Sequence, residues 1–315
     1  MKVSRRGAIA PFFVMEVMKA AAVREATGRD VLHMEVGQPS TPAPRKVLAA
    51  ATQALASDKL GYTDALGVPP LREAIAGHYR DYYGVSVAPE RIVVTTGSSA
   101  AFLLAFLAAF DVGDRVAVAE PGYPAYRNIM RALGIEPVAR PARAERNFHP
   151  TADLFETAEN LAGVLVASPA NPTGTMLNHA ELKALVDATV RRDIRLVVDE
   201  IYHGITYGGR AETVLALTDQ AVVVNSFSKY FSMTGWRLGW MVLPPDLLRQ
   251  VECIAQNFFI SPPSLSQVAA IASFDAYEEL DANVARYAAN RALLLNELPA
   301  AGFERLAPAD GAFYI

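Results

Sequence analysis

The sequence contains a single cysteine, Cys253, among its 315 residues. One thiol cannot form an internal disulfide, so a disulfide-stabilised fold is excluded and a reducing compartment is favoured. Excess charge is small too: the net charge is −4, which gives no sign of a nucleic-acid-binding surface. We therefore expect no nucleic-acid partner. The five histidines lack the spacing of metal ligands, so we also expect no metal site; they are His33, His78, His149, His179 and His203.

Long apolar runs are also missing. The first apolar stretch, residues 7–14, is short, contains Pro11 and is followed at once by charged residues. A secretory signal needs a longer apolar region, and a membrane-spanning helix needs about 20 apolar residues. We therefore expect no signal peptide, no membrane partner and a cytoplasmic location.

A regular alternation of short apolar segments with helix-like segments begins near residue 91. Wholly apolar strands that alternate with helices are typical of an α/β fold, in which helices cover both faces of a mostly parallel sheet. The expected strands cover residues 92–95, 115–119, 135–140, 164–167, 196–198, 221–224 and 238–243, and the expected helices cover 100–110, 123–133 and 178–192.

The segments before and after this region have a different pattern. We predict helices over 12–27, 44–56 and 71–83, with a short strand over 31–36. After the last strand of the alternating region, we predict helices over 247–256, 264–274 and 278–298 and a strand over 303–306. The sequence ends at Ile315 in what resembles the middle of a strand.

Lys229 follows an apolar run that is predicted to be a buried strand. A lone lysine in that position is commonly a surface residue whose stem lies on apolar surface while its ammonium reaches water. Here Ser226 and Ser228 precede the lysine, and Arg237 follows it by eight residues. The amine can form an imine with a carbonyl cofactor, while hydroxyls and a guanidinium can bind a phosphate dianion. Residues 225–237 therefore predict a site for a carbonyl cofactor that carries a phosphate.

Three further motifs come shortly after predicted strands, where ligands bind in parallel sheets. Gly-Ser-Ser at 97–99 could bind an anion at a helix start, although a serine N-cap has the same pattern. The loop over 168–174 could hold the Asn171 amide rigidly, although its sequence also suits a β-turn. Asp199 ends a buried strand, where a carboxylate is costly unless it is paired, for example with a pyridinium nitrogen. It could instead cap the next helix.

The motifs occur in a fixed order: Gly-Ser-Ser, Pro-Gly-Tyr-Pro-x-Tyr, Asn-Pro-Thr-Gly, Asp-x-x-Tyr, Ser-x-Ser-Lys and Gly-Trp-Arg-x-Gly. In this combination the sequence, from about Gly37 to its last residue, resembles the class I and II aminotransferases, which are pyridoxal-phosphate enzymes of the aspartate aminotransferase fold. The resemblance implies an α/β fold whose large domain has a mostly parallel sheet of the seven-stranded type, with helices on both faces. It also implies a smaller α/β domain built from both ends of the chain. The expected parts are an N-terminal arm and helix (1–36), the cofactor domain (37–275) and the start of the C-terminal small domain (276–315).

The resemblance implies pyridoxal 5'-phosphate as the cofactor and a role for each motif residue. Lys229 would hold the cofactor as an imine and later move a proton between substrate and cofactor. Asp199 would contact the pyridine nitrogen and make the ring an electron sink, and Tyr123 would stack on the ring. Tyr202 and Asn171 would contact the ring O3', and Gly37 would contact the substrate carboxylate. The phosphate would be bound by Ser98, Ser99, Ser226 and Arg237, and less directly by Ser228.

Tyr62 is similar to a tyrosine that, in this family, binds the phosphate of the partner subunit's cofactor. If the similarity holds, each site is shared between two subunits. The resemblance therefore implies a homodimer.

The C-terminal end departs from the family pattern. In the family, the strand that begins Gly-Ala-Phe-Tyr is followed by several dozen residues that complete the small domain and carry an arginine for the substrate carboxylate. No arginine in this sequence can be assigned to that role. We therefore expect a complete cofactor site and an incomplete substrate site.

Our leading functional hypothesis is an aminotransferase that exchanges the amino group of an L-amino acid with a 2-oxo acid by a ping-pong route. The same fold serves β-C–S lyases and other eliminating enzymes, which form different products. An inactive truncated paralogue or an effector-sensing domain are further alternatives, but no DNA-binding domain precedes Val31 and no basic patch is present. The sequence does not indicate the substrate: Phe12 and Phe13 could line an apolar pocket or belong to a helix core.

Overall fold

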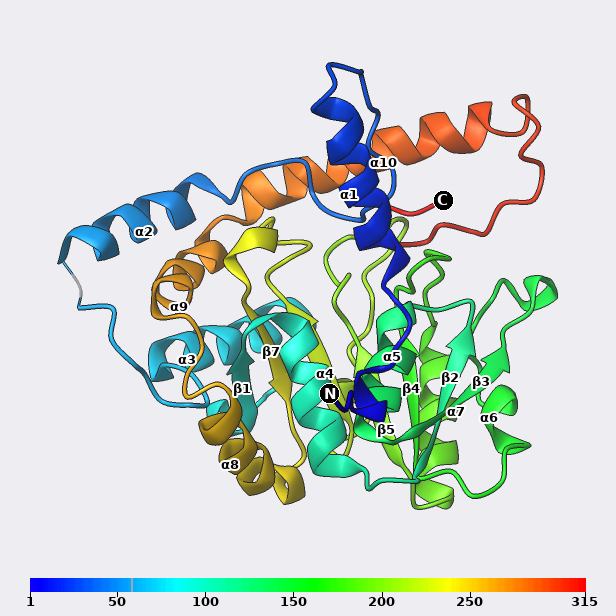
Figure 1. The fold of residues 1–315 in the computed structure, drawn as a ribbon, viewed down its shortest axis with the longest axis horizontal. Helices are drawn as coiled ribbons and strands as arrows, with labels where there is room; N and C mark the ends of the chain where they lie inside the picture. Colours follow the sequence, from blue (N-terminus) through cyan, green and yellow to red (C-terminus); the bar gives the residue numbers. More distant parts are fainter. Residues whose placement is uncertain (58) are drawn as a thin grey trace.

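The computed structural model describes residues 1–57 and 59–315. Its centre is a seven-stranded sheet with the order β1-β7-β6-β5-β4-β2-β3 (Figure 1). Strand β7 is antiparallel to its neighbours β1 and β6, and the other neighbouring strands are parallel. The predicted α/β fold with a mostly parallel sheet is confirmed. The strands are β1 (Ile92–Thr95), β2 (Arg115–Glu120), β3 (Glu136–Pro141), β4 (Gly163–Ala167), β5 (Arg195–Asp199), β6 (Val222–Ser226) and β7 (Gly239–Val242).

Alternate residues of each strand face opposite sides of the sheet. In β1, Ile92 and Val94 belong to one buried apolar cluster, and Val93 belongs to the other. Helices cover both clusters, which explains why the strands are apolar throughout instead of alternating with polar residues. The first cluster includes residues of α2 (Arg45–Ser57), α3 (Pro69–His78), α7 (His179–Arg191) and α9 (Ser264–Ile271), and the second includes residues of α4 (Gly97–Ala109), α5 (Pro124–Leu133) and α8 (Leu248–Phe258).

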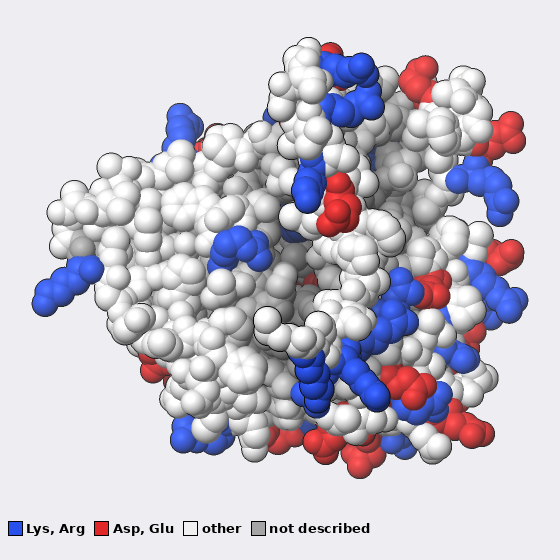
Figure 2. Space-filling view, in the orientation of Figure 1, with Lys and Arg blue, Asp and Glu red and all other residues white. Residues whose placement is uncertain are grey.

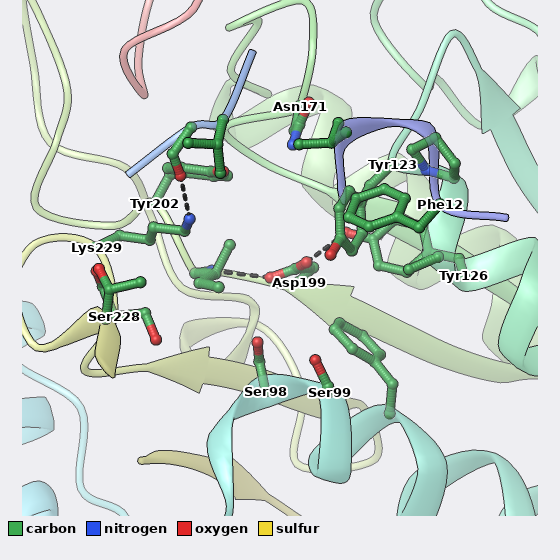
Figure 3. Close-up of a pocket in the computed structure, with 18 of the residues that line it drawn as sticks. Phe12, Ser98, Ser99, Tyr123, Tyr126, Asn171, Asp199, Tyr202, Ser228 and Lys229 are labelled. Carbon is green, nitrogen blue, oxygen red and sulfur yellow. Dashed lines mark hydrogen bonds between the residues drawn. The ribbon is translucent and has the colours of Figure 1, made fainter. Parts of the chain in front are cut away.

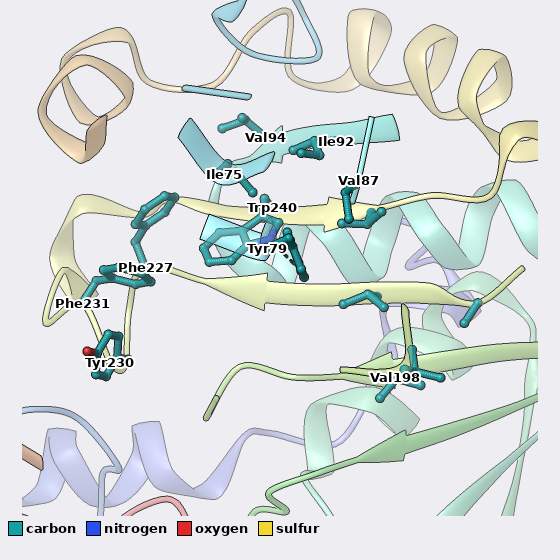
Figure 4. Packing of buried hydrophobic residues seen from close by; sticks show 14 of the residues in the cluster. Ile75, Tyr79, Val87, Ile92, Val94, Val198, Phe227, Tyr230, Phe231 and Trp240 are labelled. Carbon is teal, nitrogen blue, oxygen red and sulfur yellow. Dashed lines mark hydrogen bonds between the residues drawn. The ribbon is translucent and has the colours of Figure 1, made fainter. Parts of the chain in front are cut away.

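Aromatic packing supports the loop that follows β6. Trp240 of β7 is fully buried and its ring lies 4.8 Å from that of Phe227, at a tilt of 58° (Figure 4). The indole N–H of Trp240 donates to the Tyr79 hydroxyl at 3.2 Å. Because buried aromatic pairs of this kind are well fixed, Phe227 gives the loop with Lys229 a rigid base.

Both predicted strands outside the alternating region are wrong. Residues 31–36 and 303–306 form no strand, and the side chains of Leu32 and Met34 are 84% and 88% exposed. A strand needs a neighbour for its hydrogen-bond ladder, and within the described ranges neither segment has one. Near the second segment the structure has only an isolated bridge between Thr206 and Gly311.

The helices outside the alternating region form close to their predicted positions. They are α1 (Phe13–Glu25), α2, α3, α8, α9 and α10 (Tyr277–Glu297). In Figure 1, α1 and α10 lie above one end of the sheet, on the same side as the C-terminus. None of the helices in the described part of the chain combines the length and apolarity needed to cross a membrane. The same residues contain no group of three or more His, Cys, Asp or Glu side chains suited to a metal ion.

Candidate active site

A cavity of about 230 Å³ lies at the end of the sheet where the parallel strands have their carboxyl ends. This edge is where open α/β sheets place their ligands. The strands bring together residues that are far apart in the sequence, as Figure 3 shows. The polar wall includes Ser98 after β1, Asn171 after β4, Asp199 at the end of β5 and Lys229 after β6.

The structure brings most of the predicted site residues to this cavity, but not Ser226 or Tyr62. The Ser226 hydroxyl is buried beneath Ser228, where it accepts from the Ser228 amide at 3.0 Å and lies 3.2 Å from the Leu238 carbonyl oxygen. Tyr62, which was predicted to act in the partner subunit's site, is 84% exposed and lies outside the cavity wall of its own chain. The predicted residues in the wall are Gly37, Ser98, Ser99, Tyr123, Asn171, Asp199, Tyr202, Ser228, Lys229 and Arg237.

Lys229 presents its amine inside the cavity. Nζ donates to the Gly37 carbonyl oxygen at 2.5 Å, so Gly37 contacts Lys229 through its carbonyl. Burial lowers the pKa of Lys229 from 10.5 to about 8; nearby Asp199 opposes this shift and Arg237 adds to it. Because the nucleophile is the neutral amine, a lysine of this kind is reactive much closer to neutral pH than an exposed one.

Asp199 is a buried carboxylate, only 3% exposed. The Tyr126 hydroxyl donates to its Oδ2, and the Ile201 amide donates to its Oδ1 at 2.9 Å (Figure 3). Burial raises the pKa of Asp199 to about 6, while the two hydrogen bonds and the charge of Lys229 limit the rise. At neutral pH the group is therefore mainly ionised, desolvated and available for a cationic partner.

Tyr126 was missed by the sequence reasoning, although it is the second tyrosine of the Pro-Gly-Tyr-Pro-x-Tyr motif. We expect Tyr126→Phe to raise the pKa of Asp199, because the lost hydrogen bond favours the ionised carboxylate. The acid limb of the pH profile of kcat/KM should move upward by about one pH unit. Activity should fall most below pH 7 and recover as the pH rises. An unshifted acid limb would show that Tyr126 only fills space.

The start of α4 forms a corner of the cavity whose groups suit an anion. Ser98 and Ser99 lie in the first turn of this 13-residue helix, and Arg237 lies beside it. Gly97 has a φ of +71°, and a Cβ there would lie 2.3 Å from the Arg237 guanidinium. Glycine therefore allows the guanidinium to approach the helix N-terminus, where amides, hydroxyls and a positive charge together favour a phosphate.

Tyr314 is a second residue that the sequence reasoning missed. Its hydroxyl lies 2.6 Å from the Tyr202 hydroxyl and accepts from the Asn171 side-chain amide at 3.1 Å. It also lies against Gly37, since a Cβ on that glycine would be 1.9 Å from the Tyr314 oxygen. The two residues predicted to hold the ring O3', Tyr202 and Asn171, are thus joined through the Tyr314 hydroxyl.

The remaining wall of the cavity is largely apolar. Phe12 contacts Tyr123 edge to face, with ring centroids 5.6 Å apart and an interplanar angle of 87°. Phe13 is 71% exposed and lies outside the wall. Of the two phenylalanines considered for an apolar pocket, only Phe12 is in position. Other apolar side chains in the wall are Val14, Met15, Val36, Phe102 and Ile129.

Comparison with known proteins identifies the family to which the chain belongs. The family model for aminotransferases of class I and II matches residues 29–315. A valine–pyruvate aminotransferase from Mycobacterium tuberculosis is 52% identical, and the match covers 100% of this chain and 82% of the relative.

Solved structures agree as well. A crystal structure of an aminotransferase from Mycobacterium tuberculosis has a TM-score of 0.96 at 51% identity, covering 99% of this chain and 82% of that one. Aspartate aminotransferase from Thermus thermophilus with maleate has a TM-score of 0.95 at 31% identity, covering 99% of this chain and 84% of that one. The chain is therefore an enzyme of the class I and II aminotransferase family.

Proposed function

We propose that this enzyme binds pyridoxal 5'-phosphate in the cavity and moves an amino group from an L-amino acid to a 2-oxo acid. The observation that carries the proposal is one cavity that combines a lysine of lowered pKa, a buried carboxylate and a helix start beside an arginine. These groups suit an aldehyde, a pyridinium nitrogen and a phosphate, respectively. When bound, the cofactor supplies an electron sink for negative charge at the substrate's α-carbon.

Each wall residue then has a separate task. Lys229 would hold the cofactor covalently and, once the substrate amine has displaced it, carry a proton to and from the α-carbon. Asp199 would keep the ring nitrogen protonated, and Tyr123 would cover a ring face. Tyr202 and Asn171 would bind the ring hydroxyl. We propose Ser98, Ser99, Ser228 and Arg237 as the phosphate ligands of this subunit, with Ser226 holding Ser228 from beneath.

We further propose aliphatic amino acids such as valine as donors and pyruvate as the acceptor. The relative from Mycobacterium tuberculosis bears the name valine–pyruvate aminotransferase. The apolar side chains of Phe12, Met15 and Ile129 in the cavity wall suit a branched aliphatic side chain, because burying such a group is favourable by about 1.5–3 kcal/mol.

The first half-reaction tests this function directly. Cofactor-loaded enzyme is mixed with L-valine and no acceptor, and the cofactor form, the oxo acid and ammonia are measured. We expect pyridoxamine phosphate and 3-methyl-2-oxobutanoate in a ratio of about one to one per site. Pyruvate should then restore the starting form and yield alanine. L-Cystathionine, which carries a leaving group on its β-carbon, is tested in parallel. Ammonia and pyruvate formed from it without pyridoxamine phosphate would contradict transamination and favour the eliminating alternative, while D-valine serves as the unreactive control.

The pH dependence of cofactor loading tests the state of Lys229. The neutral amine attacks the aldehyde, so the loading rate of the apoenzyme should rise about tenfold per pH unit below pH 8. It should level off above that value, because the pKa of Lys229 is about 8. An exposed lysine would keep accelerating toward pH 10.5. Stopped-flow absorbance at a series of pH values distinguishes these two profiles.

We also propose a cytoplasmic homodimer with shared sites. Charged side chains are sparse around α2 and α3, on the left of the face in Figure 2, and gather only at its lower edge below α8. Large apolar side chains are exposed in these segments and the adjoining loops, and such patches are typical of interfaces. The exposed residues are Leu48, Leu55, Tyr62, Phe258 and Ile260.

The proposed cytoplasmic location rests on the single cysteine, which suits a reducing compartment.

Mixed dimers test whether Tyr62 acts in the partner's site. Tyr62→Phe alone should weaken cofactor binding about tenfold, because a hydrogen bond to a charged phosphate is lost. When the Tyr62→Phe chain is combined with a Lys229→Ala chain, one site regains both native residues. Each purified mixed dimer should then recover tight binding at one of its two sites, as measured by cofactor titration. No recovery would mean that Tyr62 acts within its own subunit or not at all.

A further inference from the structure

A carboxylate, Glu35, lies in the wall of the cavity among apolar residues and has no task in the proposed cofactor contacts. Its side chain is 12% exposed. His33 Nδ1 lies 2.8 Å from Glu35 Oε1, and His33 Nε2 lies 2.9 Å from Glu25 Oε1. Glu25 ends α1, whereas His33 and Glu35 belong to the segment that leads to Gly37. The three side chains therefore tie the end of α1 to the cavity wall.

This group of three carries a net negative charge. Both imidazole nitrogens of His33 face carboxylates, which raises the pKa of His33 to about 9; the hydrogen bond from His33 lowers the pKa of Glu35. At neutral pH the group then contains two carboxylates and one imidazolium. Glu35 is the member that lines the cavity, so part of the uncompensated charge lies where a substrate binds.

Among the described residues, the cations in the cavity wall are Lys229 and Arg237, and the proposed function uses both for the cofactor. The imidazolium of His33 lies outside the wall and is already paired with Glu35 and Glu25. A dicarboxylic substrate would meet apolar side chains and the charge of Glu35. Like charges repel more strongly in a cavity from which water is excluded than in open solvent, and such repulsion is a common device of specificity.

We propose that Glu35 is a specificity-determining residue that excludes substrates with a second carboxylate, such as aspartate, glutamate and their 2-oxo acids. His33 acts as a positioning residue that holds Glu35 at the wall, and it is itself held by Glu25. The inference rests on the proposed function and narrows its substrate class to amino acids with uncharged side chains.

The test uses cofactor-loaded enzyme and two unreactive ligands, 3-methylbutanoate and succinate, whose dissociation constants are measured by calorimetry. Glu35→Gln keeps the shape of the side chain and removes its charge. We expect it to tighten succinate binding about tenfold and to change 3-methylbutanoate binding less than about twofold. The ratio of kcat/KM for aspartate to that for valine should rise by a similar factor. Glu16→Gln, which removes an exposed charge of α1 outside the cavity wall, is the matched control. It should leave unchanged both the relative affinity for the two ligands and the ratio of kcat/KM for aspartate to that for valine.

A second variant changes the charge in the opposite direction. His33→Gln removes the imidazolium but keeps an amide that can donate to Glu35, so it should weaken succinate relative to 3-methylbutanoate by about threefold or more. The role of Glu35 would be overturned if the ratio of the dissociation constants for succinate and 3-methylbutanoate stayed unchanged in both variants. It would also be overturned if the two dissociation constants changed by the same factor. Failure of the proposed function looks different: wild-type enzyme would then form no pyridoxamine phosphate from valine, whatever the residue at position 35.

Discussion

Replacing Lys229 with alanine should lower transamination by at least about four orders of magnitude, because the substitution removes both the covalent attachment and the proton carrier. The change leaves a small space in a cavity and not in the packed core, so the chain should still fold. Borohydride reduction followed by peptide mass spectrometry should find the cofactor on Lys229 in the native enzyme and on no residue of the variant. Turnover is measured with saturating amino and oxo acids.

Two controls make that result specific. Lys183 is 55% exposed on α7, where it pairs with Asp187 at 2.7 Å. Lys183→Ala should keep the covalent cofactor and the native rate. Added methylamine should partly restore the Lys229→Ala variant, because a small amine can carry the missing proton inside the cavity. Undiminished turnover of Lys229→Ala without added amine would refute the assignment.

The second large effect is expected at Asp199. Asp199→Ala should retain some cofactor through the phosphate contacts but lower kcat about a thousandfold, because the ring nitrogen loses the charge that keeps it protonated. Asp199→Asn should fall nearly as far, since it keeps the side-chain shape and removes the charge. Rapid-kinetic measurement of the first half-reaction separates this loss from weaker cofactor binding.

The neighbouring residue provides a matched control. Glu200 is fully buried, and burial raises its pKa to about 8, so it is mainly protonated at neutral pH. One of its oxygens accepts from the Thr213 hydroxyl at 3.0 Å and from the Val214 amide at 2.8 Å. Glu200→Gln keeps an uncharged acceptor there and should change kcat less than about threefold. An equal loss in the two variants would point to damage of β5 and not to the charge of Asp199.

The sheet could be predicted because its strands are local apolar runs of the right length, separated by turn residues and helices. Residues 31–36 have four apolar residues of six and residues 303–306 have two of four, yet neither segment forms a strand. A strand also needs a neighbour that supplies the hydrogen-bond ladder, and the local pattern contains no information about that neighbour.

Site residues could be predicted where a motif follows a strand, as with Asn171 and Lys229. They were missed where the role depends on a contact distant in sequence. Tyr126 acts on a carboxylate 73 residues away, and Tyr314 reaches Tyr202 across 112 residues. Spacing gave one usable signal: Tyr126 follows Tyr123 by three residues at a helix start, which places the two side chains on one face.

The position of β1 in the sheet has a consequence for synthesis in the cell. This apolar strand is made early, but in the finished sheet its hydrogen-bonded neighbour is β7, about 150 residues later. At about 5–20 residues per second, a ribosome needs roughly 7–30 s to reach β7. During that interval Ile92–Thr95 is an unpaired edge that can pair with other nascent chains. Lower temperature and added chaperones during expression should therefore raise the yield of native enzyme more than a change of buffer after lysis.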